Sequence, residues 1–436
     1  GLQAVVTAPV PGTLPQSGTG ALPESLQPAA TVRSALPITR GWAAVRSHCG
    51  PAPSPLDSGA VLIAIPRETA PREQRVALIP ETVARLVKSG FQASVETGAG
   101  LRAGHTDDAY RAAGAAIASD FASCVAGAAA VFKVREPSLP EIAAIPEGAL
   151  LLGLLGRGED AAQIERYRAR QLGVFSLNAV PRISRAQKMD ALSSMAACAG
   201  YKAVLLAAST SGKFFPLLMT AAGTVAPSRV LVLGAGVAGL QAIATARRLG
   251  AVVEAFDVRP AVKEEVQSLG ATFVEMQLGD AGVGAGGYAK ELDEQRNELI
   301  RHTIAARLPT TDVIISTASI PGRRAPLLVT AAAVATMKPG SVIVDLAADG
   351  GGNCALTQAG ETVVHAGVTI IGPLDIAATL PAHASQMYSR NEYELLVHLA
   401  KDAKLVVDFT DEITRGSCLT YAGRPASELA PTGNSA

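Results

Sequence analysis

The chain has 436 residues, enough for two or three domains of about 150 residues each. Its 38 Lys and Arg residues balance its 38 Asp and Glu residues, so no net field would draw it to nucleic acid or to an anionic membrane. Hydrophobic residues make up 48% of the chain and aromatic residues only 4%, so a large and mainly aliphatic core is expected.

Two further classes of protein are disfavoured. No apolar stretch approaches the ~20 residues that span a bilayer, so we expect no direct membrane insertion. The five cysteines are scattered, with neither a CxxC pair nor a histidine at metal-ligand spacing. The sequence therefore predicts reduced thiols and no metal site.

Residues 1–58 are rich in Pro, Ser, Ala and Gly and show no sustained periodicity. This composition is typical of a disordered leader. Ordered structure is expected to begin with the apolar run at residues 61–65.

Strand and helix signals then alternate as far as residue 190. Short apolar runs predict strands at residues 61–65, 91–96, 130–134, 150–152 and 173–176, and periodic segments predict helices at residues 81–89, 107–113 and 161–171. Such alternation predicts a parallel sheet covered by helices on both faces. We assign residues 59–190 to an N-terminal α/β domain.

A second α/β unit follows a long apolar helix expected at residues 190–208. Its six strands are expected at residues 230–233, 252–256, 272–274, 313–315, 342–344 and 368–371, which matches a doubly wound Rossmann domain over residues 191–374. A helix expected at residues 385–399 returns to the first domain, so that residues 375–423 complete it and residues 424–436 form a disordered tail. The predicted fold class is α/β, with two Rossmann-like doubly wound parallel-sheet domains and a cleft between them.

A glycine-rich turn follows the first strand of the second unit. It reads Gly234-Ala235-Gly236-Val237-Ala238-Gly239, after four aliphatic residues and before a helix expected at residues 237–249. The first glycine allows the tight turn, the second lets the backbone approach a pyrophosphate, and the third allows close packing of helix and strand. Free N–H groups at the helix N-terminus then face the phosphates. This pattern predicts a dinucleotide site.

The second strand of this unit ends in Asp257-Val258-Arg259, and Asp257 lies eighteen positions after Gly239. A carboxylate there accepts hydrogen bonds from the adenosine ribose and repels a 2′-phosphate, which favours NAD(H) over NADP(H). Arg259 leaves the opposite preference open, because an Arg can bind the 2′-phosphate.

A second glycine cluster spans residues 279–287 and ends at Tyr288. It is too rich in glycine to form a regular helix or strand. A mobile lid with Tyr288 as its contact residue is one interpretation, and a slack surface loop is the other.

Three segments carry a family resemblance. They are Pro66-Arg67-Glu68 with residues 73–80, the segment from Pro181 to Ser194, and the stretch from Val230 to Arg259 with residues 286–291. Residues 339–347 and 351–354 fit more weakly. Over about residues 60–420 the chain resembles the NAD(H)-binding domain I of proton-translocating NAD(P) transhydrogenase.

The resemblance implies that residues 181–194 form a loop over the nicotinamide, with functional positions at Arg182, Gln187, Asp190 and Ser193. From the residues alone, a helix-cap ion pair between Arg182 and Asp190 is equally compatible. The resemblance also implies direct hydride transfer from NAD(H) here to NADP(H) on a partner subunit, membrane-spanning partner subunits and a homodimer. It implies a cytoplasmic location, peripheral on the inner face of the cell membrane through these partners.

The sequence departs from the family pattern near its end. The family reads Gly-x-Thr-(Asn/Asp)-x-Pro-x-Arg, whereas the segment Gly372 to Thr379 carries Thr379 in place of the Arg. Any contact made by that Arg is therefore in question.

Two other functions remain open. Alanine dehydrogenase shares the ancestry, and Lys133 matches its substrate-binding Lys, although a structural Lys fits equally well. Asp349 could take the place of the acid of the dehydrogenase. However, residues 151–158 lack the His that transfers a proton in that enzyme, and the amine–carbonyl chemistry needs this His. A non-catalytic NAD(H)-binding module is the third hypothesis.

Overall fold

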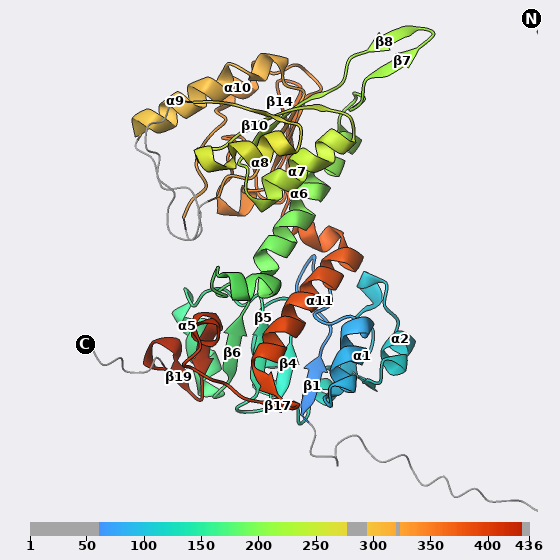
Figure 1. Ribbon diagram of the computed structural model, residues 1–436, viewed down its shortest axis with the longest axis vertical. Helices are drawn as coiled ribbons and strands as arrows, with labels where there is room; N and C mark the ends of the chain where they lie inside the picture. The colour runs from blue at the N-terminus through green and yellow to red at the C-terminus, as the bar shows by residue number, and fades with distance from the viewer. Residues whose placement is uncertain (1–60, 277–293, 320–322, 430–436) are drawn as a thin grey trace, which may run out of the picture. The chain divides into compact units, whose positions relative to one another are not determined.

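The computed structural model describes residues 61–276, 294–319 and 323–429 (Figure 1). The expected leader at residues 1–58 and the glycine cluster with Tyr288 lie outside the described residues.

The first sheet joins eight strands of the described chain in the order β19-β18-β6-β5-β4-β1-β2-β3. Its strands are β1 (Leu62–Ile65), β2 (Gln92–Glu96), β3 (Ala116–Ala118), β4 (Ala130–Phe132), β5 (Leu150–Gly153), β6 (Gly173–Ser176), β18 (Cys418–Tyr421) and β19 (Arg424–Pro425). Strands β1 to β6 are parallel and follow the 3-2-1-4-5-6 order of a doubly wound sheet.

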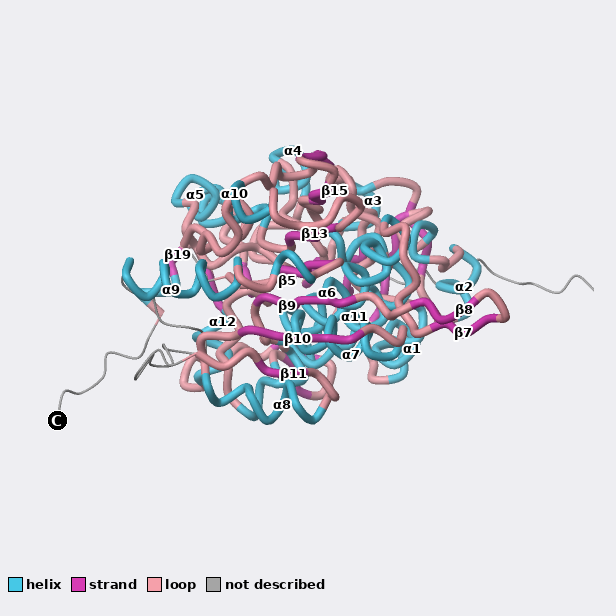
Figure 2. Tube along the Cα trace, turned by 90° about the horizontal axis from the view of Figure 1, so that it is seen from above, coloured by secondary structure: helices cyan, strands magenta, loops and turns pink. Residues whose placement is uncertain are grey.

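The second sheet has the order β11-β10-β9-β12-β13-β15-β14, and its first six strands in that order are parallel (Figure 2). Its strands are β9 (Arg229–Leu233), β10 (Val252–Phe256), β11 (Thr272–Phe273), β12 (Val313–Ser316), β13 (Val342–Asp345), β14 (Thr362–His365) and β15 (Val368–Ile371). All six strands expected from the sequence are present. The sequence analysis missed β14, because this edge strand is mostly exposed and lacks a buried face.

Twelve α-helices occur in the described residues. They are α1 (Pro80–Lys88), α2 (Asp107–Ala112), α3 (Phe121–Val125), α4 (Leu139–Ala144), α5 (Ala161–Ala169), α6 (Ala191–Thr210), α7 (Val237–Arg248), α8 (Lys263–Ser268), α9 (Glu294–Ala305), α10 (Ala331–Val334), α11 (Pro381–His398) and α12 (Glu412–Ser417). The described residues also contain two small hairpins, namely β7 (Leu218–Thr220) with β8 (Gly223–Val225), and β16 (Ala400–Lys401) with β17 (Lys404–Leu405).

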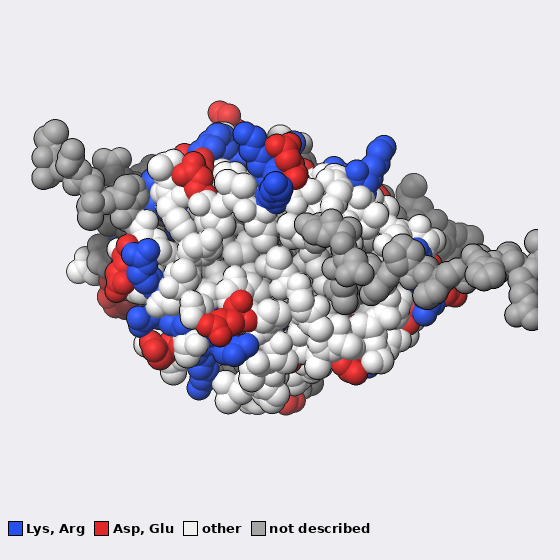
Figure 3. Space-filling model, turned by 90° about the horizontal axis from the view of Figure 1, so that it is seen from below, with Lys and Arg blue, Asp and Glu red and all other residues white. Residues whose placement is uncertain are grey.

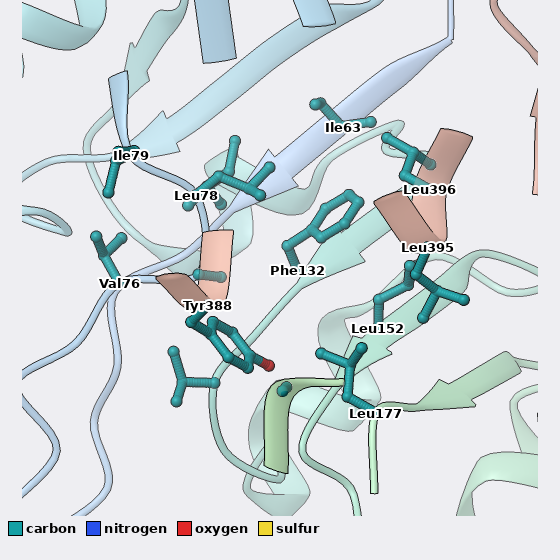
Figure 4. Packing of buried hydrophobic residues seen from close by; sticks show 14 of the residues in the cluster. Ile63, Val76, Leu78, Ile79, Phe132, Leu152, Leu177, Tyr388, Leu395 and Leu396 are labelled. Carbon is teal, nitrogen blue, oxygen red and sulfur yellow. The ribbon is translucent and has the colours of Figure 1, made fainter. Parts of the chain in front are cut away.

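The central strands of each sheet are covered by helices on both faces, and because successive strand residues point to opposite sides, these strands contribute to two cores. In the first sheet, Ile63 and Phe132 pack in one core with Tyr388 and Leu395 of α11, as Figure 4 shows. Leu151 packs on the other face with residues of α3, α4 and α5. The second sheet likewise packs against α6, α7 and α8 on one face and against α9 and α10 on the other.

Helix α6, green in Figure 1, belongs to both cores. Its first half contributes Met195 and Cys198 to the core of the first sheet, and its second half contributes Val204 and Ala207 to the core of the second. By length and composition alone this helix of 20 residues is apolar enough to cross a membrane. Seven of its residues are buried, and the buried apolar ones pack in the two protein cores.

Segments from the end of the chain join the first sheet. Strand β18 pairs antiparallel with β6, and α11 packs in the same core as β1 and β4. The disordered tail expected at residues 424–436 is wrong for its first part, because Arg424 and Pro425 form β19 and pair with β18, and Ala426–Glu428 form a 3-10 helix. The sequence signal was weak there since a two-residue edge strand has no periodicity. Residues 430–436 lie outside the described residues.

The charged side chains on one face of the molecule are mixed in sign. Figure 3 shows Lys and Arg next to Asp and Glu around the edge of this face, with other residue types in its centre. No basic patch of the kind that binds nucleic acid is visible among the described residues on this face.

Candidate functional site

The turn that joins β9 to α7 requires glycine at two positions. Gly234 has a φ of 95°, a left-handed conformation that glycine adopts without strain. A Cβ on Gly239 would lie 1.8 Å from the Gly234 carbonyl oxygen, so no larger residue fits. The turn is thus tight and closely packed, as the sequence predicted.

The middle glycine has a different role, because a Cβ on Gly236 would meet nothing within 4 Å. Gly236 is the N-cap of α7, and its carbonyl accepts the first helical hydrogen bond, from Leu240. The N–H groups of Val237 and Ala238 have no acceptor within the helix, as in every first helical turn. Open space beside free N–H groups fits a bound phosphate.

This turn lies at the point where the strand order of the second sheet reverses. Strands β10 and β12 flank β9 on its two sides, and Thr317, just after β12, approaches the turn. A Cβ on Gly234 would lie 2.7 Å from Thr317 Oγ1, which itself donates to the Gly234 carbonyl at 3.1 Å. Open α/β sheets bind ligands at this position, outside the carboxyl ends of the strands.

The sequence analysis missed the carboxylate that organises the neighbouring loops. Asp345 ends β13, is fully buried, and accepts hydrogen bonds from Ser316 Oγ, at 2.8 Å, and from the backbone N–H of Asn353, at 2.7 Å. Further donors are Ala347 N, Cys354 N and Thr357 Oγ1. Asn353 in turn bonds both the N–H and the carbonyl of Ala318. The available signal was an acid at the end of a buried strand, followed by Gly-Gly-Asn.

Asp257 lies at the end of β10, beside the turn. Its Oδ2 accepts a hydrogen bond of 2.7 Å from the Ala235 N–H, which ties the acid to the glycine motif. Its other partner is Arg259, whose guanidinium forks across both carboxylate oxygens. The sequence singled out both residues as candidates for this site but did not indicate that they pair with each other.

The segment at residues 181–194 contains the 3-10 helix Ser184–Met189, then Asp190 as the N-cap of α6, and finally the first turn of α6. Asp190 accepts from the Ser193 N–H at 2.9 Å and from Ser193 Oγ at 2.6 Å. Arg182 and Gln187 lie exposed on the loop. The structure thus brings Asp190 and Ser193 together as a helix cap and leaves Arg182 and Gln187 at the surface.

Polar contacts hold this loop to segments near the end of the chain. Asn391 of α11 donates to the Lys188 carbonyl at 2.8 Å, and Arg185 pairs with Asp411 at 2.9 Å. The loop is therefore positioned by residues about 200 positions away in the chain.

Helix α6 connects this loop to the glycine turn between β9 and α7. A Cβ on Gly200 would lie 2.0 Å from the Ala238 carbonyl oxygen, so α6 and α7 touch at the first turn of α7. Ten residues separate Asp190 from Gly200 in the sequence, a span of roughly 15 Å along a helix. One rigid element therefore fixes the separation of the two parts of the candidate site.

A second set of charges occupies the strand-order reversal of the first sheet, between β1 and β4. Lys133 follows β4, is 1% exposed, and places its Nζ 2.9 Å from Glu141 Oε1 and 3.7 Å from Glu68 Oε2. Burial raises the pKa of Glu68 to about 7, against the lowering effect of the Lys133 charge. Lys133 is thus enclosed between two acids.

The neighbouring cations of this set are paired as well. Arg75 forks onto Glu73 at 2.6 and 2.7 Å, and both side chains are buried. Arg135 bonds the same Glu73 at 2.9 Å and also pairs with Asp375. Burial would raise the pKa of Glu73, but its hydrogen bonds and the charge of Arg75 hold that pKa below the ordinary value.

Thr379 and the cysteines were also singled out in the sequence. Thr379, which replaces the family Arg, ends a 3-10 helix and donates to the Ile376 carbonyl at 2.7 Å. The four cysteines in the described residues are buried free thiols. Among these residues there is also no group of His, Cys, Asp and Glu that could hold a metal ion.

Comparison with known families matches nearly the whole described chain. The family model "Alanine dehydrogenase/PNT, N-terminal domain" matches residues 64–199, and "Alanine dehydrogenase/PNT, C-terminal domain" matches residues 203–428. The boundary between the two models falls within α6.

Three similar proteins bear on the choice of function. An NAD(P) transhydrogenase alpha-subunit chain of Rhodospirillum rubrum is 47% identical over 370 residues, which cover 83% of this chain and 96% of that protein. A crystal structure of transhydrogenase from Sinorhizobium meliloti superposes with a TM-score of 0.76 at 40% identity, covering 84% of this chain and 99% of that one. The alanine dehydrogenase of Bacillus subtilis is 33% identical, over 67% of this chain and 72% of that protein.

Proposed function

This chain belongs to the alanine dehydrogenase/PNT family, and we propose that it is the NAD(H)-binding component of a proton-translocating NAD(P) transhydrogenase. The observation that carries the proposal is the β9–α7 turn, which combines two glycines required by packing with open space at Gly236. The higher identity to transhydrogenase subunits than to alanine dehydrogenase supports the choice within the family.

Particular residues of this turn would hold the cofactor. The backbone of Gly236, Val237 and Ala238 would bind the pyrophosphate, and Asp257 would accept hydrogen bonds from the adenosine ribose. Arg182, Gln187, Asp190 and Ser193 would lie toward the nicotinamide end, at the far end of the α6 segment that touches α7. Val258 and Arg259 would flank the adenosine.

The nicotinamide ring supplies a hydride when the cofactor is bound. The chain then needs to align the ring and exclude water, and it needs no acid or base. This requirement fits the loop at residues 181–194, where Asp190 is committed to capping α6 and its carboxylate is bonded by Ser193. The role of the loop is therefore positioning.

The second nicotinamide would be NADP(H), held by a partner subunit. We propose further subunits that bind NADP(H) and span the membrane, a homodimer of this chain, and a peripheral location at the inner face of the cell membrane. The names of the relatives, which describe one subunit of several, support this assembly.

Alanine dehydrogenase activity is the second candidate. A substrate carboxylate would need a free cation, but Lys133 is enclosed by Glu141 and Glu68, and Arg75 is forked onto Glu73. Residues 151–158 contain no His to transfer a proton. The geometry thus favours hydride exchange with a partner over chemistry on a small substrate.

One pair of assays separates the candidates. With NADH alone, the chain should show no turnover of pyruvate plus ammonium. Mixed with the NADP(H)-binding component of a related transhydrogenase, it should transfer a hydride to a nicotinamide analogue bound there. Alanine oxidation by the isolated chain would overturn the proposal, and NADH binding without either activity would favour a non-catalytic binding module.

A further inference from the structure

The carboxylate of Asp257 is fully used by donors of this chain. Oδ2 accepts from the Ala235 N–H at 2.7 Å, and Oδ1 accepts from the Arg259 N–H at 2.8 Å. The Arg259 side chain adds Nε to Oδ1 at 3.0 Å and Nη2 to Oδ2 at 2.9 Å. A carboxylate offers about four lone-pair positions, so these four donors saturate it.

The four donors are of two kinds. The two backbone donors belong to the glycine turn and to the loop that follows β10, so they fix the orientation of the carboxylate. The two guanidinium donors are carried by a side chain that can rotate away. They also form a fork, the geometry in which Arg binds both oxygens of a carboxylate at once.

A ribose presents the same pattern of donors as this fork, because its two adjacent hydroxyl groups can each donate to one oxygen of a carboxylate. With the backbone donors in place, the only acceptor positions left for the ribose are those that Arg259 holds. The pair is also shielded, since the Asp257 side chain is 6% exposed and that of Arg259 is 18% exposed. Water therefore weakens this pair less than it weakens an ordinary surface ion pair.

We propose that Arg259 is an internal competitor of the cofactor ribose, which holds the two acceptor positions on Asp257 and releases them when NAD(H) binds. The inference rests on the proposed NAD(H) site. Its consequence is a lower affinity for NAD(H), because the apparent dissociation constant rises as the fraction of molecules with a free carboxylate falls. A lower affinity suits a component whose cofactor must dissociate and be replaced in every cycle.

The test is the affinity for NADH, measured by titration of its fluorescence and by calorimetry, without any turnover assay. Arg259→Gln should bind NADH at least threefold more tightly than the wild type. Arg259→Lys, which keeps the charge but cannot fork, should fall between the two. The matched control is Arg111→Gln, which removes an equal charge and breaks an exposed pair with Asp108 on α2. Its affinity should stay within twofold of the wild type.

A double-mutant cycle ties the effect to the carboxylate. In an Asp257→Asn background, Arg259→Gln should not raise the affinity for NADH, because the carboxylate that accepts the fork is already gone. A gain that persists in this background, or an Arg259→Gln variant that binds NADH equally or more weakly, would overturn the inference. Absence of NADH binding in the wild type itself would instead contradict the proposed function, so the two failures are distinguishable. A thermal melt of each variant establishes that it is folded.

Discussion

The phenol oxygen of Tyr388 lies 2.7 Å from Oε1 of Glu392, one turn further along α11, and 2.9 Å from the carbonyl oxygen of Lys133. All three groups are buried. A phenol has one proton and cannot donate to both oxygens at once, so a protonated Glu392 completes the network by donating to the phenol while the phenol donates to Lys133. Burial, the largest cause, raises the pKa of Glu392 to about 8.

This network predicts a loss of stability as the pH rises. The unfolded chain releases the Glu392 proton near its ordinary pKa of 4.5 and the folded chain only at about 8, so between these values the folded state holds the extra proton and its stability falls with increasing pH. Glu392→Gln removes this dependence and should be the more stable form at pH 8, by about 4 kcal/mol at most.

Thermal melts between pH 5 and pH 8 measure the difference between the two proteins. Glu361→Gln, at an exposed position, is the matched control and should leave the pH profile unchanged. If the difference in melting temperature between the wild type and Glu392→Gln stayed constant from pH 5 to pH 8, Glu392 would already be ionised in the folded protein.

Substitutions at two glycines of the turn should affect different properties, one the binding of NADH and the other the stability of the fold. Gly236→Ala should fold normally, because its Cβ meets no atom within 4 Å, and should weaken NADH binding about tenfold or more by filling the space beside the free N–H groups. Gly239→Ala should instead lower the melting temperature strongly, since its Cβ collides with a carbonyl oxygen. Calorimetric titration and thermal melts distinguish the two effects. Unchanged NADH affinity in Gly236→Ala would place the phosphates elsewhere.

Asp257 predicts the choice of cofactor. The wild type should bind NADH about ten times more tightly than NADPH, because the carboxylate repels a 2′-phosphate. Asp257→Asn should weaken NADH binding and reduce this preference, since the amide carries no charge. Equal affinities of the wild type for both cofactors would assign Arg259 to the 2′-phosphate instead.

The loop before α6 predicts different effects at two residues. Gln187→Ala removes an exposed side chain and should slow hydride transfer to the partner without changing stability. Asp190→Ala removes the cap of α6 and should also cost about 1 kcal/mol of stability. Single-turnover rates and melts test both.

Asp190→Asn is the control for the cap, because its amide oxygen still accepts from the Ser193 N–H. It should keep the melting temperature of the wild type while slowing transfer. Variants at Gln187 and Asp190 that lose NADH affinity at an unchanged transfer rate would contradict the positioning role.

The sequence by itself determined the six parallel strands of the second sheet and the glycine turn that follows β9. Every residue that the turn needs lies between β9 and the first turn of α7, so local spacing carries the whole requirement. The buried strands were equally readable, because a parallel strand covered on both faces is an unbroken aliphatic run. Within the two sheets, strands β3, β14, β18 and β19 were missed. Strands β3 and β14 are partly exposed edge strands, and β18 and β19 join the first sheet by antiparallel pairing from the end of the chain.

Tertiary structure decided which charges are available for chemistry. In the sequence, Lys133 was compatible with a cation that holds a substrate, yet folding encloses it between Glu141 and Glu68. Arg135 meets Asp375 across 240 positions of the chain. No local pattern encodes such contacts, because the free energy of a buried charge depends on which partners the fold brings within hydrogen-bond distance and on how completely water is excluded.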